Sequence, residues 1–145
     1  MKIPKIKLVL SERVNASERP TIKSSSDAYE ILKPFYDEEM EMREVCYAII
    51  MNRKNRVLGV VLVSIGTASH ALLNARAIAQ ACLLANGTAV VLSHNHPSGE
   101  NFPSQADDGM TAKIKQCLLI LDIQLLDHVI MTFDGYYSYA DNAKL

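Results

Sequence analysis

The stretch TAVVLSHNHPSGENFPSQAD, residues 88–107, contains the features from which the fold can be predicted. Its first part, Thr88–Ser93, is mainly apolar, which is typical of a buried β-strand. The following residues, 94–103, include two prolines and a glycine and predict a loop. Ser104 then precedes a run with helical spacing, and its hydroxyl can cap the first turn. A strand, a loop and a helix are therefore expected in this order.

Apolar patterns on either side of this stretch predict the other elements. Two apolar runs, Val45–Met51 and Val57–Ser64, flank the polar residues 52–56 and are typical of a β-hairpin. Helices are predicted over Asn74–Ala85 and from Ser104 through Leu121, and strands over Leu125–Thr132 and Tyr136–Ala140. The resulting order, β-β-α-β-α-β-β, indicates a mixed sheet sandwiched by the two helices, which is an α/β or α+β layer fold.

The beginning of the chain differs from the rest. It combines a short extended segment with polar residues, and we predict an N-terminal arm over 1–25 beside a single domain over 26–145. Ser26 or Asp27 is expected to cap a helix that runs through Phe35 and opens this domain. A chain of 145 residues is long enough for one domain that buries about 68–70% of its unfolded surface.

Composition and charge narrow the function classes. Fifteen Lys and Arg against sixteen Asp and Glu give a net charge of −1, whereas proteins that bind nucleic acids mainly by electrostatics carry a basic excess. Direct nucleic-acid binding is therefore not expected. The only early apolar run, Leu8–Leu10, is too short for a secretory signal or a membrane span. We expect a cytoplasmic protein without a membrane partner, in which an exposed strand edge could pair two chains as a homodimer.

The cysteines do not indicate a disulfide framework. Cys46, Cys82 and Cys117 are odd in number and have no C-x-x-C spacing. Each falls on an apolar face and is predicted to be a core thiol. None of them is expected to complete a metal site.

Two histidines and one aspartate of the quoted stretch have the spacing of a catalytic zinc site. His94 and His96 alternate at the end of the predicted strand, so both imidazoles emerge on one side. Asp107 lies in the first turn of the next helix, which the loop can fold back over the strand end. Two histidines and one carboxylate leave a fourth tetrahedral position for water, as in catalytic zinc sites.

Each part of this pattern also has a purely structural interpretation. H-x-H at a strand end can be two hydrogen-bonded loop residues, and Ser104-x-x-Asp107 is also a helix capping box. The combination at a fixed distance favours the metal site. Further along, Asp127 and His128 can either support the metal ligands or form a buried polar pair at a strand start, and both interpretations stay open. His70 falls in a polar connection and is predicted to be a loop residue.

The stretch 94–107 has the form H-x-H-x7-S-x-x-D and resembles the motif of the JAMM (JAB/MPN+) metalloproteases. Its HNHPSG start, together with LDHVI at 126–130, is similar to the RadC-like branch of bacterial JAB-domain proteins. The resemblance covers about residues 26–145 and implies a cytidine-deaminase-like JAB/MPN fold with α/β/α layers. It also implies a single zinc ion per chain, held by the two histidines and the aspartate of the motif.

The same resemblance implies roles for two further residues. The family places a glutamate on an early strand as general acid/base, and Glu44, at the start of the first predicted strand, is the matching position. Ser104 matches the family serine that hydrogen-bonds the reacting centre. Glu38, Glu39 and Glu41 lie nearby, so the choice of Glu44 depends on its place directly before the strand.

These residues imply the hydrolysis of an amide bond, in the family often an isopeptide bond. Zinc lowers the pKa of a bound water to about 7, and a nearby carboxylate can move its proton to a leaving amine. We therefore expect a zinc metallopeptidase that acts on a peptide or protein. A zinc deaminase is excluded because the chain has no P-C-x-x-C. The alternative is a DNA-repair-associated or partner-binding module that keeps the zinc with little or no hydrolase activity, although residues 1–25 are too short for the helix-hairpin-helix segment of full-length relatives.

Overall fold

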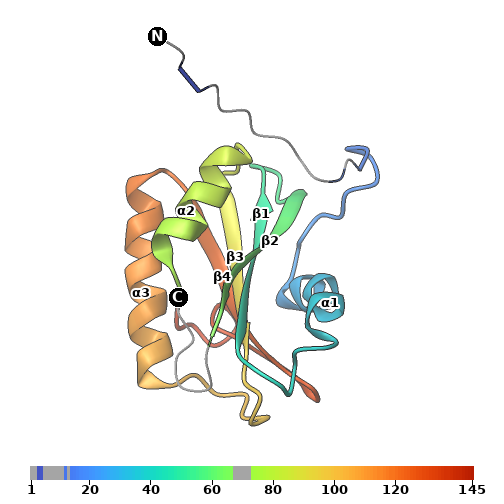
Figure 1. The fold of residues 1–145 in the computed structure, drawn as a ribbon, viewed down its shortest axis with the longest axis vertical. Helices are drawn as coiled ribbons and strands as arrows, with labels where there is room; N and C mark the ends of the chain where they lie inside the picture. Colours follow the sequence, from blue (N-terminus) through green and yellow to red (C-terminus); the bar gives the residue numbers. More distant parts are fainter. Residues whose placement is uncertain (1–2, 5–11, 13, 67–72) are drawn as a thin grey trace.

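The computed structural model describes residues 3–4, 12, 14–66 and 73–145 (Figure 1). Its elements are α1 Ser25–Tyr36, β1 Val45–Met51, β2 Val57–Ile65, α2 Ala75–Leu84, β3 Ala89–Asn95, α3 Gln105–Ile120, β4 Gln124–Thr132 and β5 Gly135–Ser138. The predicted loop residue His70 and residues 1–2, 5–11 and 13 of the predicted arm lie outside the described residues. In the described ranges, none of the helices combines the length and apolarity that a membrane crossing needs.

Five strands of the described chain form one mixed sheet in the order β2-β1-β3-β4-β5. β1 pairs antiparallel with both β2 and β3, and β5 pairs antiparallel with β4. β3 and β4 are parallel, so the chain must cross over between them, and α3 makes this crossover. The mixed sheet with helices against it confirms the predicted α+β fold.

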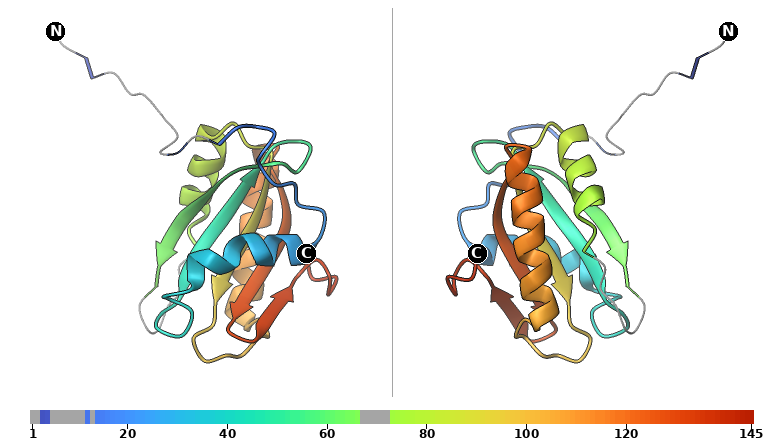
Figure 2. Two further views of the ribbon diagram at one scale, coloured as in Figure 1. Left: turned by 90° about the vertical axis from the view of Figure 1, so that its right-hand side faces the viewer. Right: turned by 90° about the vertical axis from the view of Figure 1, so that its left-hand side faces the viewer.

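Helices cover both faces of the sheet, but in a different distribution from the predicted one. α1 lies on one face, and α2 and α3 lie side by side on the other (Figure 2). The prediction that α2 and α3 sandwich the sheet is therefore wrong. Side chains of β1 alternate, so that Ile49 packs in the core with α1, whereas Ala48 and Ile50 pack in the core with α2 and α3. Because both faces are apolar, both need a helical layer, and α1 provides the second one.

The first helix begins earlier than predicted. Ser24, rather than Ser26 or Asp27, is its N-cap, and the Ser24 hydroxyl accepts a hydrogen bond from the Asp27 N–H. The Asp27 carboxylate accepts the Ser24 N–H at 2.9 Å, so this aspartate is the third helical residue of a capping box. Ile22, before the helix, is buried in the core with α1. The boundary between arm and domain at residue 25 stays a prediction.

β3 is longer than predicted and carries His94 within the sheet. The pattern predicts an end at Ser93, but the strand continues through Asn95. His94 pairs with Cys46 of β1, and Asn95 pairs with Met131 of β4. A central strand has hydrogen-bonding neighbours on both sides, so its pairing continues as far as those neighbours extend. As a result, the first predicted ligand lies on a rigid strand and not in a loop.

β5 also differs from its predicted bounds. It runs from Gly135 to Ser138, whereas the pattern predicts Tyr136–Ala140. At its last residue, the Ser138 hydroxyl donates to the buried Asp127 carboxylate at 2.6 Å. Tyr139 is buried, and its N–H still donates to the His128 carbonyl at 3.1 Å. The Ala140 N–H instead donates to the Asp127 side chain at 3.0 Å, so the strand does not continue.

Candidate metal centre

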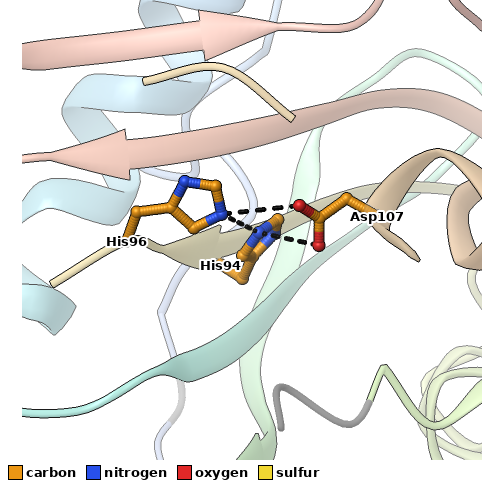
Figure 3. Close-up of side chains that lie close together, drawn as sticks. All are labelled: His94, His96 and Asp107. Carbon is orange, nitrogen blue, oxygen red and sulfur yellow. Dashed lines mark hydrogen bonds and ion pairs between the residues drawn. The ribbon is translucent and has the colours of Figure 1, made fainter. Parts of the chain in front are cut away.

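The imidazoles of His94 and His96 and the carboxylate of Asp107 converge at one end of the sheet (Figure 3). One ligand atom of each residue lies within 4.8 Å of the other two. His94 Nε2 lies 2.9 Å from His96 Nε2 and 3.4 Å from Asp107 Oδ1, and His96 Nε2 lies 3.5 Å from Asp107 Oδ2. The fold therefore brings together the three residues predicted to be ligands.

These distances fit a tetrahedral metal ion. Zinc binds histidine nitrogen and carboxylate oxygen at about 2.0–2.2 Å, which places neighbouring ligand atoms about 3.3 Å apart. The two nitrogen–oxygen distances, which run to different oxygens of the Asp107 carboxylate, are 3.4 and 3.5 Å, and the nitrogen–nitrogen distance of 2.9 Å is somewhat shorter. Imidazole suits several divalent transition metals, and a carboxylate balances their charge. The group could therefore hold a metal ion, with one position left for water or substrate.

The loop between His96 and α3 explains the spacing of the motif. The Gly99 N–H donates to the His96 carbonyl at 3.0 Å, and Gly99 has a φ of +80°, which glycine adopts without steric cost. This turn reverses the chain toward Ser104, the N-cap of α3. Asp107 follows in the first helical turn and so returns to the end of β3.

One ring nitrogen of His96 is committed to the backbone. His96 Nδ1 lies 2.6 Å from the Glu100 carbonyl oxygen, which can only accept a hydrogen bond. Nδ1 therefore carries the proton of the neutral ring, and Nε2 presents its lone pair to the other ligands. This is the usual arrangement of a histidine that binds a metal ion through Nε2.

His94 is fully buried, and its second ring nitrogen contacts another histidine. His94 Nδ1 lies 2.8 Å from His128 Nε2 of β4. The carboxylate of Asp127 instead accepts the Ser138 hydroxyl at 2.6 Å and the Ala140 N–H at 3.0 Å. His128 therefore contacts a candidate ligand, as the first interpretation has it, whereas Asp127 is buried and holds the chain after β5, which neither interpretation predicts.

Burial and neighbouring charges give the three groups different pKa values. Burial lowers the pKa of His94 to about 4, so this ring is neutral at neutral pH. The hydrogen bond with Asp107 raises the pKa of His96, and the charge of Glu44 contributes a smaller effect in the same direction. Burial alone would raise the pKa of Asp107, but hydrogen bonds from His96 and Ser104 lower it on balance, which keeps the carboxylate ionised. A proton on His96 is therefore the competitor of a metal ion.

Glu44 lies directly before β1 and is half-buried. Its carbonyl accepts the Gly66 N–H at 2.8 Å. Asn95 holds the backbone on both sides of it, because Oδ1 accepts the Val45 N–H at 2.7 Å and Nδ2 donates to the Arg43 carbonyl at 2.9 Å. The structure thus places Glu44 within electrostatic reach of the cluster but outside the three-residue ligand set.

The neighbouring glutamates have other environments. The Glu39 carboxylate is paired with the Arg43 guanidinium at 2.6 Å through two hydrogen bonds. Glu38 and Glu41 are exposed. Glu44 is therefore the one of these four glutamates whose charge acts on the pKa of His96, and its catalytic role stays a prediction.

Ser104 acts on Asp107 in this structure. Its hydroxyl donates to Asp107 Oδ2 at 2.6 Å and accepts the Asp107 N–H at 3.1 Å. The Ser104 N–H also donates to Asp107 Oδ2, at 2.8 Å. The capping box is therefore real, and it orients the carboxylate of a candidate metal ligand. Contact between Ser104 and a reacting group stays a prediction.

Thr111 is a part of the site that the sequence analysis missed. Its Oγ1 lies 2.6 Å from His128 Nδ1 and donates to the Asp107 carbonyl at 2.7 Å. A signal was available, because Thr111 lies on the buried stripe of α3 with Ile114 and Leu118. A polar side chain on such a stripe needs a buried partner. The Glu100 carbonyl that binds His96 has no comparable signal, since any residue supplies a carbonyl.

The fold and the cluster together define a JAB-type domain with a potential metal site, and comparisons with known proteins agree. The family model for the RadC-like JAB domain matches residues 22–144. A UPF0758 protein of Chlorobium phaeovibrioides is 35% identical over 124 residues, 86% of this chain and 55% of that protein. A UPF0758 protein of Flavobacterium johnsoniae is 38% identical over 120 residues, 83% and 52% of the two chains. The chain belongs to the RadC-like JAB domain family and spans about half the length of the curated relatives it matches.

Proposed function

We propose that this protein is a zinc-dependent hydrolase of the JAMM type that cleaves a peptide or isopeptide bond. The observation that carries the proposal is the convergence of two imidazoles and an ionised carboxylate, with their ligand atoms within 4.8 Å of one another. Membership of the RadC-like JAB domain family supports it. A bound zinc ion would lower the pKa of a water molecule to about 7 and polarise the carbonyl of the scissile bond.

The protein's own residues would divide the remaining tasks. His94, His96 and Asp107 would hold the ion, and Ser104 would orient the Asp107 carboxylate. The Glu44 carboxylate would accept a proton from the attacking water and deliver it to the leaving amine, as a general base and then a general acid. Its half-buried position and its effect on the pKa of His96 support this role.

The competing function is a RadC-like module that binds DNA or a protein partner and keeps the metal without hydrolysis. The net charge of −1 argues against DNA as the main partner. A peptide or protein substrate, a homodimer and a cytoplasmic location remain predictions.

The first test is the metal content of the purified protein by mass spectrometry, with His94→Ala and Asp107→Ala alongside. We expect close to one zinc ion per chain in the wild type and a sharp fall in both variants, because each removes a ligand. Equal metal in all three proteins would contradict the assigned site.

The second test is hydrolysis of peptide and isopeptide substrates by the zinc-loaded protein in isotopically labelled water. The new carboxyl group should contain one labelled oxygen. Glu44→Gln, which keeps the shape of the side chain, should retain the metal but lose at least about 100-fold in rate. A zinc-loaded wild type that cleaves none of these substrates would favour the binding module.

A further inference from the structure

We propose that Thr111 and His128 are positioning residues of the metal centre that hold His94 in the neutral form able to bind a metal ion. In that form, Nδ1 of His94 carries the proton and Nε2 presents a lone pair. The inference rests on the proposed metal site and adds to it two residues that are not ligands.

Three consecutive hydrogen bonds carry the argument. His94 Nδ1 lies 2.8 Å from His128 Nε2, and His128 Nδ1 lies 2.6 Å from Thr111 Oγ1. Thr111 Oγ1 in turn lies 2.7 Å from the Asp107 carbonyl oxygen. The chain begins at the side chain of one candidate ligand and ends at the backbone of another, and it joins β3, β4 and α3.

The end of this chain determines the position of every proton in it. The Asp107 carbonyl can only accept, so it takes the single hydroxyl proton of Thr111. Thr111 Oγ1 must then accept from His128, which places the proton of neutral His128 on Nδ1. His128 Nε2 is left as an acceptor, so the proton of His94 lies on Nδ1. The lone pair of His94 Nε2 consequently faces His96 and Asp107.

Burial makes this proton order important. His94 and His128 are fully buried, and Thr111 is 2% exposed, so water cannot replace a missing partner. The ring of Tyr139 stacks on His128 with centroids 4.9 Å apart and planes 12° apart. This contact restricts rotation of the imidazole, so the hydroxyl of Thr111 decides which nitrogen of His128 is protonated.

Two substitutions of Thr111 separate the hydroxyl from the shape of the side chain. Thr111→Val removes the hydroxyl and keeps the branched shape, whereas Thr111→Ser keeps the hydroxyl. In Thr111→Val, His128 Nδ1 loses its acceptor, so His128 should move its proton to Nε2 and donate to His94 Nδ1. His94 would then be protonated at Nε2, where a metal ion has to bind.

The first measurement is made on the metal-free full chain at about pH 8, where imidazoles of ordinary pKa are neutral. Proton–nitrogen correlation spectra of the imidazoles report which nitrogen carries the proton. We expect His94 to be protonated at Nδ1 in the wild type and in Thr111→Ser, and mainly at Nε2 in Thr111→Val. An unchanged His94 signal in Thr111→Val would overturn the proposal, whether or not the protein binds metal.

The second measurement is zinc affinity by competition with a chromophoric chelator. Thr111→Val should bind zinc about 10- to 100-fold more weakly than the wild type, with Thr111→Ser close to it. Equal affinity in the wild type and Thr111→Val would overturn the positioning role. If the wild type binds no zinc but the His94 signal differs as expected between the wild type and Thr111→Val, the proposed function is refuted and the proton order is supported. If Thr111→Val does not fold, His128→Phe, which keeps the stack on Tyr139, should show the same loss of zinc affinity.

Discussion

Two pairs of buried polar residues lie on opposite faces of β3 and β4. His94 and His128 lie on the face covered by α3, where they contact each other and the candidate metal ligands. Asn95 and Asp127 are their neighbours in the chain and lie on the face covered by α1. The pairs differ in what their polar atoms bind, although burial and sequence position are nearly the same.

The side chains on the α1 face bind mainly backbone groups, and the Ser138 hydroxyl on Asp127 is the exception. Asn95 accepts the Val45 N–H at 2.7 Å and donates to the carbonyls of Met40 and Arg43 at 2.8 and 2.9 Å. On the α3 face, the hydrogen bonds instead leave Nε2 of His94 with a lone pair that faces the His96 imidazole and the Asp107 carboxylate. A buried polar group with all its partners stabilises the fold, whereas one with a lone pair aimed at a carboxylate and another imidazole is suited to a cation.

The largest expected effect is on the α3 face. Asp107→Asn removes the negative charge from the cluster but keeps the size of the side chain. Loss of a residue that only supports a ligand typically weakens metal binding about 10- to 100-fold. Zinc affinity should fall by more than this in Asp107→Asn, because Asp107 is itself a proposed ligand. Competition with a chelator measures the change, and a variant that binds zinc as well as the wild type would show that this carboxylate is not a ligand.

On the α1 face, Asn95→Leu should reduce the stability and leave zinc binding unchanged. The variant keeps the branching and the number of heavy atoms of the side chain but leaves the Val45 N–H and the carbonyls of the preceding turn without partners. We expect the free energy of unfolding to fall by about 3–5 kcal/mol, measured with urea. Below its unfolding transition, the variant should still bind zinc. Loss of zinc affinity in the folded variant would break the comparison between the faces.

The two faces should also differ in their response to acid. Burial lowers the pKa of His94 to about 4 and the pKa of His128 well below 6.5. Below pH 6.5 and above these lowered pKa values, the two histidines bind protons in the unfolded chain but not in the folded protein. The metal-free protein should therefore lose a few kcal/mol of stability as the pH falls from about 6.5 to about 4. The raised pKa of His96 affects stability at higher pH. Its contribution to the free energy of unfolding is complete below pH 6.5 and is lost as the pH rises above that value.

Urea unfolding of the metal-free protein over this pH range measures the acid effect. Asn95→Leu should lower the whole curve without changing its slope, because the amide does not titrate. His128→Phe should flatten the curve by removing one titrating ring. A wild-type curve that does not change between these pH values would contradict the assigned protonation of the buried histidines.

The smallest effect is expected at Asp127. Burial raises the pKa of its carboxyl group, so the hydrogen bonds do not fully offset the cost of burying the charge. Asp127→Asn removes that cost but weakens the hydrogen bond to Ser138. We expect the free energy of unfolding to fall by about 1 kcal/mol, measured by thermal or urea unfolding. Zinc affinity should not change, in contrast to substitution of His128. A parallel loss of affinity would show that these two neighbours act as one unit.

Periodicity was enough to predict most elements, and hydrogen bonding moved their ends. Val45–Met51 matches β1, and the helix predicted over Asn74–Ala85 contains α2, with Asn74 and Ala85 as its caps. The ends of β3 and β5 differ because they depend on strand pairing and on the Asp127 carboxylate, which are long-range contacts. The distribution of helices between the faces differs for a similar reason, since a strand with two apolar faces does not indicate which helix covers which face.

The sequence by itself determined the chemical types of the site and their spacing. His94, His96 and Asp107 are separated by distances along the chain that suit a strand end, a loop and a first helical turn. Only the tertiary structure decided which nitrogen of each histidine faces the cluster. For His94, that choice depends on His128 and Thr111, which lie far along the chain. For His96, it depends on the backbone carbonyl of Glu100. A proton's position on an imidazole follows from the acceptor that folding places beside it, and no local pattern specifies that acceptor.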